Sequence, residues 1–150
     1  MVEAMLDDGQ RLLALNEVFI GHASHQSARY VLDWADRHER QSSSGLIVTT
    51  GTGATGWGRS IHLCQRSDLA MPRPAEPALA FFVREAWPSP TSGASLTEGR
   101  LETSDQLLIT SHMNESGVIF GDGIEADHLA FNWGQTAAVR IASDRLRLLR

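Results

Sequence analysis

Apolar and polar side chains alternate along much of this chain, which is the pattern of half-buried β-strands. The first alternating run stops at Asp7–Gln10 and resumes at Leu12. Because an Asp-Gly pair between two apolar runs favours a tight hairpin turn, residues 1–21 are predicted to form two antiparallel strands. The chain thus begins within a strand, and we expect that Met1 is not the natural start of the protein.

Further short strands are predicted along the rest of the chain. Residues 29–34 alternate, and residues 45–50 and 78–83 are apolar runs typical of buried strands. We assign no strand to the polar residues 38–44, and the proline-rich residues 71–77 are expected to form a surface connection. The later predicted strands are 106–112, 117–120, 128–132, 136–142 and 145–149. Short strands separated by close turns predict an all-β fold, a β-sandwich of antiparallel strands.

Residues 51–58, called the Gly/Thr loop below, contain four glycines and interrupt this pattern. The segment is too rich in glycine for a regular strand or helix. Its amides and threonine hydroxyls suit a phosphorylated or ribosyl ligand, and Trp57 can stack on a planar base. An ordinary loop remains the alternative interpretation. The spacing of Trp57, Ile61 and Cys64 predicts a short helix after the loop.

Composition narrows the classes of function. The chain has 150 residues, which is the length of one domain. Its basic residues are all arginine, and with 18 acidic residues the formal net charge is −5, which argues against bulk binding of nucleic acid or of an anionic membrane. The absence of lysine excludes a Walker A lysine and Schiff-base chemistry within this chain. A single cysteine and the lack of a signal or membrane segment predict a cytoplasmic protein.

Two segments in this order, residues 15–20 and 45–57, resemble the C-terminal domain of the NAD kinase family. That family has a Leu-Asn-Glu-Val strand and, further along, the signature Gly-Leu-x-Val-Ser-Thr-Pro-Thr-Gly-Ser-Thr-Ala-Tyr. The divergent branch that includes the mitochondrial-type enzymes is more similar still, with Thr-Gly-Thr-Gly in the loop and tryptophan in place of tyrosine. Residues 82–85 also resemble the Arg-Glu strand of this branch.

The resemblance implies that residues 1–150 form one NAD-binding domain of an enzyme that makes NADP. Such an enzyme transfers the γ-phosphoryl group of ATP, with Mg²⁺, to the 2′-hydroxyl of the adenosine ribose of NAD. Its general base would be the aspartate of a Gly-Gly-Asp-Gly motif in a preceding α/β domain that this chain lacks, so the chain alone would be inactive. We also expect a homo-oligomer, because the sandwich has open strand edges. Carried over by position, the NAD-binding residues are Asn16, Glu17, Thr52, Thr55, Gly56, Trp57 and Ser60.

Two further positions, Ser44 and Asp122, correspond less directly to the family's motifs. Ser44 stands where many family members have an aspartate that recognises the dinucleotide, so it is a possible NAD contact and the choice between NAD and NADH stays open. Asp122 lies in a Gly-Asp-Gly sequence after the other motifs, and we expect a hairpin turn there and no catalytic base. We therefore assign no catalytic residue and no metal ligand to this chain. The alternatives are a non-catalytic nucleotide-sensing domain and the acceptor half of a related lipid or sugar kinase.

Overall fold

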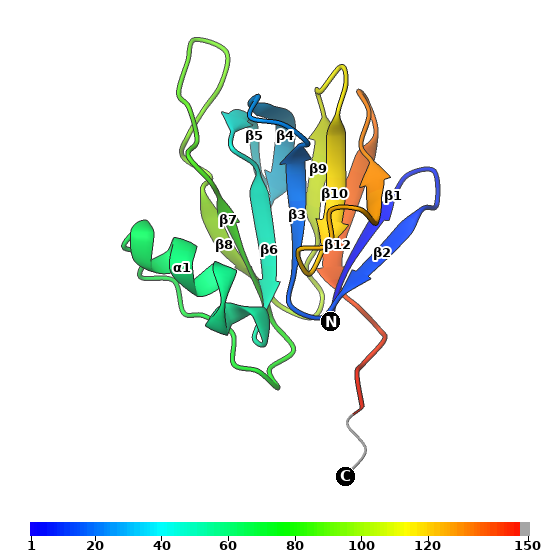
Figure 1. The fold of residues 1–150 in the computed structure, drawn as a ribbon. Coiled ribbons are helices and arrows are strands. Elements are labelled where there is room, and N and C mark those ends of the chain that lie inside the picture. Colours follow the sequence, from blue (N-terminus) through cyan, green and yellow to red (C-terminus); the bar gives the residue numbers. More distant parts are fainter. Residues whose placement is uncertain (148–150) are drawn as a thin grey trace.

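The computed structural model, which describes residues 1–147, consists of two six-stranded antiparallel sheets packed face to face (Figure 1). In spatial order, the first sheet contains β2 (Arg11–Ala14), β1 (Val2–Leu6), β12 (Thr136–Ile141), β9 (Leu107–Ser111), β4 (Ala28–Trp34) and β5 (Arg37–Ser43). The second sheet contains β11 (His128–Ala130), β10 (Gly117–Gly121), β3 (Glu17–His22), β6 (Leu46–Thr50), β7 (Leu79–Val83) and β8 (Glu98–Leu101). A 3-10 turn, η1 (Gly53–Thr55), and one helix, α1 (Trp57–Cys64), follow β6.

The main core lies between the two sheets and is made by alternate residues of each strand. In β4, Tyr30 and Leu32 are fully buried in this core, whereas Arg29 on the other face is exposed. In β3, Val18 and Ile20 face the same core. The predicted all-β sandwich with one short helix is confirmed. The helix begins at Trp57, within the residues 51–58 that were expected to contain no regular helix.

The turn of the predicted N-terminal hairpin is confirmed, but the predicted second strand is divided into two strands, β2 and β3. Val2 pairs with Ala14 across the hairpin β1–β2, as the Asp-Gly signal indicates. The second run does not continue to residue 21 as one strand, however. It breaks at Leu15 and Asn16, so that β2 stays in the first sheet and β3 crosses to the second. The apolar pattern continues through the break, because both strands bury apolar residues in one core.

The prediction that the polar residues 38–44 form no strand is wrong, because strand β5 covers most of them. Its inward-facing Gln41 and Ser43 are buried, and each has a specific partner. The Gln41 amide donates to the Leu96 carbonyl at 2.8 Å, and the Ser43 hydroxyl pairs with the Tyr30 hydroxyl at 2.8 Å. Buried polar groups are tolerated when they are hydrogen-bonded, so the strand forms although no apolar alternation marks it.

The sequence pattern also misses one strand and overpredicts another. Strand β8 has glycine and charged residues in three of its four positions, and no strand was predicted there. Of the predicted last strand, residues 145–147 form no strand and the remainder lies outside the described residues. Neither helical segment within residues 1–147 is long and apolar enough to cross a lipid bilayer.

Glu39, in β5, attaches the segment before β8 to the first sheet. Its carboxylate accepts hydrogen bonds from the Ser95 hydroxyl, from the amides of Ser95 and Leu96 at 3.1 and 3.0 Å, and from the Gln41 side chain at 2.6 Å. Burial raises the pKa of Glu39, but these hydrogen bonds outweigh that effect and lower the pKa to about 2. The ionised carboxylate therefore stabilises the fold.

Glu39→Gln is expected to lower the free energy of unfolding at neutral pH by roughly 2 kcal/mol, because a neutral amide accepts these bonds more weakly. Since the folded pKa lies below the ordinary value of 4.5, the difference is fully present above that value and disappears as the pH falls toward 2. Urea unfolding at a series of pH values measures it. The exposed Glu115→Gln variant is the control, and equal stability of Glu39→Gln and the native chain at neutral pH would contradict the prediction.

Candidate functional site

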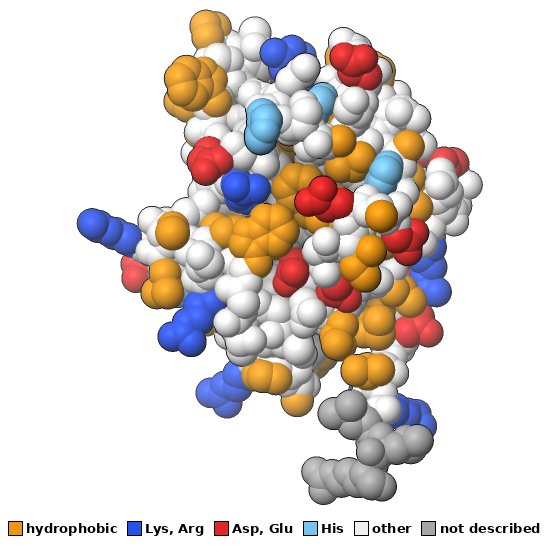
Figure 2. Space-filling model, viewed as in Figure 1, with side chains coloured by type: hydrophobic (Ala, Val, Ile, Leu, Met, Phe, Trp, Pro, Cys, Tyr) orange, Lys and Arg blue, Asp and Glu red, His pale blue; other side chains and the backbone are white. Residues whose placement is uncertain are grey.

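The outer face of the second sheet carries a small apolar cluster that α1 covers in part. Ile61 of α1 packs with Ile47 and Phe82 on this face, beside Phe19 and Phe120. Figure 2 shows hydrophobic side chains reaching the surface near the centre of this face, over β3 and β6, with acidic and basic side chains around them. Of the predicted site residues, Trp57 packs against this cluster.

Trp57, the first residue of α1, lies at the edge of this cluster, near an aromatic ring and a cation. Its ring is parallel to that of Phe19, with 6.0 Å between centroids and 9° between planes. The guanidinium carbon of Arg84 lies 5.5 Å from the centroid of the Trp57 ring. Phe19 in turn lies against Gly45, which has φ +106° and whose added β-carbon would be 2.5 Å from the Phe19 ring. The indole is therefore held in a fixed orientation at the surface of the sheet.

The Gly/Thr loop is fixed to the break between β2 and β3. The Thr50 hydroxyl donates to the Leu15 carbonyl at 2.7 Å and accepts the amides of Thr52 and Gly53 at 3.2 Å. The Thr50 amide donates to the Asn16 carbonyl at 2.8 Å. A β-carbon added to Gly53 would lie only 2.2 Å from this carbonyl oxygen. Glycine is required at position 53 because the loop backbone lies directly on the Asn16 backbone.

Asp122, which follows β10, forms hydrogen bonds with the same break between β2 and β3. Its carboxylate accepts the amides of Leu15 at 2.9 Å, Asn16 at 2.6 Å and Glu17 at 3.3 Å. Asp122 follows β10 in a turn and has φ +52°, a conformation that Asp and Asn tolerate better than most residues. Asp122 therefore lies in a turn, as expected, and it determines where the backbone of Asn16 and Glu17 lies.

Glu17 faces the outer side of the sheet beside this anchor. It pairs with Thr49 of β6 and is half-buried. Burial raises the pKa of Glu17 above its ordinary value, and the charge of Asp122 raises it further. The carboxyl therefore takes up a proton more readily than an exposed glutamate, and it does so next to the Gly/Thr loop.

A groove of about 820 Å³ lies beside α1. Trp57, Ser60 and Arg84 line it, together with residues of the segment 85–98. Ser44 is exposed beside it, and its amide donates to the Arg84 carbonyl at 2.8 Å. The groove thus presents an indole, a hydroxyl and a guanidinium to solvent at one edge of the second sheet.

The structure divides the predicted site residues into two groups. Trp57 and Ser60 line the groove, with Ser44 next to it. Asn16 and Glu17 belong to the anchored break between β2 and β3 and do not line the groove. The Gly/Thr loop joins the two groups, and its residues Thr52, Thr55 and Gly56 are exposed.

Two residues of this arrangement were not assigned to the site from the sequence. Arg84 was noted only within the Arg-Glu resemblance of residues 82–85, and its place over Trp57 depends on the pairing of β6 with β7. Phe19 lies within the resembling residues 15–20, where the resemblance does not distinguish it from its neighbours. The glycines Gly21 and Gly45, which leave room for its ring, were a usable signal.

Mg²⁺ was implied by the resemblance, and the acidic residues of this site do not fit it. Glu17 and Asp122 are neighbours, but both carboxylate oxygens of Asp122 accept backbone amides. Within residues 1–147, no group of three or more His, Cys, Asp or Glu side chains is placed to hold a metal ion. We assign no metal ligand to this chain.

Comparison with known proteins finds similarity in structure only. No family model and no curated protein sequence matches the chain. Among solved structures it is similar to yeast NADH kinase complexed with NADH, with a TM-score of 0.70 and 18% identity, over 93% of this chain and 39% of that one. It is also similar to an NAD kinase from Archaeoglobus fulgidus in complex with ATP, with a TM-score of 0.67 and 15% identity, over 95% and 51% of the two chains. The chain therefore has the fold of part of these NAD kinases and spans about half of their length or less.

Proposed function

We propose that this chain is the NAD-binding part of an NAD kinase, as the resemblance of residues 15–20 and 45–57 implies. The shared fold with two kinases of NADH and NAD supports the proposal. The observation that carries it is the arrangement on one face of the second sheet. There the Gly/Thr loop, anchored on Asn16, leads into an indole that lies beside Arg84 and a groove.

Each part of this face has a chemical role in the proposal. Trp57 offers a flat surface to the adenine ring, and Arg84 offers a cation to the pyrophosphate. The hydroxyls of Thr52 and Thr55 and the side-chain amide of Asn16 bind the riboses. The chain's contribution to the transfer is to hold the acceptor hydroxyl in one orientation, which accounts for much of the catalysis of phosphoryl transfer.

The base and the donor site belong, in this proposal, to an α/β domain outside this sequence. That domain would bring the Gly-Gly-Asp-Gly aspartate to the 2′-hydroxyl of the NAD adenosine ribose. Mg²⁺ bound with ATP would neutralise the charge of the transferred phosphoryl group. No residue of this chain is assigned to the metal or to proton removal.

Calorimetric titration of the chain with NAD tests the binding part of the proposal. Trp57→Ala is expected to weaken NAD binding about tenfold or more, since stacking of a base on an aromatic ring contributes roughly 1–3 kcal/mol. Trp57→Phe keeps an aromatic surface and is expected to lose less. Trp133→Ala is the control, because Trp133 is exposed in the turn between β11 and β12 and stacks on His112 instead.

The activity is tested by assaying NADP formation from NAD and ATP when the chain is combined with the α/β domain that the proposal requires. Absence of NAD binding by the chain, together with absence of NADP, would overturn the proposal. Binding of NAD without NADP formation would indicate the nucleotide-sensing alternative. Transfer of phosphate to a lipid or a sugar, and not to NAD, would indicate the remaining alternative.

A further inference from the structure

Residues 70–77, called the proline segment below, connect α1 to β7 and touch the start of the Gly/Thr loop. A β-carbon added to Gly51 would lie 1.8 Å from the Arg73 carbonyl oxygen and 2.8 Å from the Pro74 nitrogen. The two backbones are therefore in direct contact, and neither can move toward the other. The loop is thus in contact with Asn16 through Gly53 and with the proline segment through Gly51.

The proline segment has no regular secondary structure and is held by a turn closed on Glu76. The Glu76 amide donates to the Arg73 carbonyl at 2.9 Å, and the Arg73 amide donates to the Glu76 carboxylate at 2.9 Å. The hydrogen bond from the Arg73 amide lowers the pKa of Glu76, and Arg100 lowers it further. The carbonyl that contacts Gly51 thus belongs to a turn that a backbone hydrogen bond and the Glu76 carboxylate close together.

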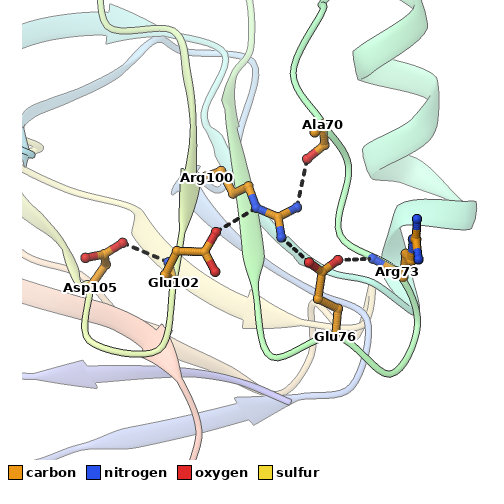
Figure 3. Close-up of polar contacts among 6 residues, drawn as sticks. All are labelled: Ala70, Arg73, Glu76, Arg100, Glu102 and Asp105. Atoms are coloured by element: carbon orange, nitrogen blue, oxygen red, sulfur yellow. Dashed lines mark hydrogen bonds and ion pairs between the residues drawn. The ribbon is translucent and has the colours of Figure 1, made fainter.

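Arg100 of β8 forms hydrogen bonds with this turn and so connects it to the second sheet (Figure 3). Its guanidinium donates to the Glu76 carboxylate, to the Ala70 carbonyl at 3.0 Å and, on the third side, to the Glu102 carboxylate at 2.8 Å. About a fifth of the Arg100 side chain is exposed, against more than half of Glu102. A planar guanidinium that makes three such bonds fixes both ends of the segment relative to β8.

We infer that Arg100 is a positioning residue for the Gly/Thr loop and that it acts through Glu76 and the Arg73 peptide. While the Arg100 hydrogen bonds are present, the proline segment holds Gly51 in place, and the amides of Thr52 and Gly53 keep donating to the Thr50 hydroxyl. Without them, the segment can move away from Gly51 and the loop gains freedom on that side. The inference rests on the proposed function, because its consequence is the affinity of the loop for a dinucleotide.

Hydrogen exchange and NAD titration of Arg100→Met test this. The variant keeps the length of the side chain and removes its donors. We expect the amides of residues 51–56 to exchange at least tenfold faster than in the native chain, and NAD affinity to fall at least tenfold. Glu76→Gln, a milder change in the same turn, is expected to shift both quantities in the same direction and by less.

Arg140→Met is the matched control, because Arg140 pairs with Glu3 at 2.8 Å in the first sheet. It is expected to leave the exchange of residues 51–56 and the NAD affinity unchanged. Unchanged exchange of these amides in Arg100→Met, or unchanged affinity despite faster exchange, would overturn the inference about Arg100. Absence of NAD binding by the native chain would instead overturn the proposed function, whatever the exchange shows.

Discussion

Gly53→Ala is expected to lower the free energy of unfolding by about 3 kcal/mol, the upper part of the range for overpacked sites. The added β-carbon would lie 2.2 Å from the Asn16 carbonyl oxygen and 2.6 Å from the Thr49 hydroxyl oxygen. A backbone carbonyl cannot rotate away as a side chain can, so the loop must leave the β2–β3 break. The same displacement is expected to abolish measurable NAD binding.

Thermal unfolding measures the stability change, which corresponds to a fall of roughly 6–12 °C in Tm for a domain of this size. Thr55→Ser is the control within the same loop. Thr55 is exposed, and serine keeps the hydroxyl that donates to the Thr52 carbonyl at 3.0 Å. A Gly53→Ala variant as stable as Thr55→Ser would show that the loop does not lie on Asn16 as described.

Asp122→Gly is expected to lower the free energy of unfolding by about 2–3 kcal/mol and to weaken NAD binding. The change removes the carboxylate that accepts the amides of Leu15, Asn16 and Glu17. A hydrogen bond to a charged group contributes a net free energy of roughly 1.5–3 kcal/mol, and the three bonds share one half-buried carboxylate, so their contributions do not add. Glycine adopts the φ of +52° freely, so this variant separates the loss of the carboxylate from backbone strain.

Two further variants at the position complete the comparison, and urea unfolding measures all three. Asp122→Ala is expected to be the least stable, because alanine adds the cost of positive φ to the loss of the carboxylate. Asp122→Asn is expected to be the most stable of the three, since its amide oxygen still accepts a backbone amide and asparagine tolerates positive φ. If Asp122→Gly were as stable as the native chain, the carboxylate would have no part in holding the break.

Much of the fold can be read from local sequence. The hairpin turn at Asp7–Gln10 follows from alternation and turn residues, and the buried strand β6 follows from a continuous apolar run. The short helix follows from the spacing of Trp57 and Ile61. The order of the two motifs also indicated the fold, which the similarity to two solved NAD kinases supports. These features depend on residues that are close together along the chain, so the local pattern of side chains predicts them.

Local patterns failed where distant residues decide the structure. Strand β5 forms because Gln41 and Ser43 find partners in Leu96 and Tyr30. An apolar pattern does not show such partners, since the side chains themselves are polar. Arg84 reaches Trp57 only because β7 pairs with β6.

The sequence alone thus predicted the strands that have an apolar pattern and the Gly/Thr loop that interrupts them. It also indicated the candidate NAD-binding residues. The tertiary structure decided where β2 ends and β3 begins, because the carboxylate at that break comes from Asp122, more than a hundred positions away. It also decided why Gly51 and Gly53 must be glycine, since the atoms that occupy the space beside them belong to Arg73 and Asn16. Steric contacts and hydrogen bonds between distant segments exist only once the chain has folded, so no local pattern encodes them.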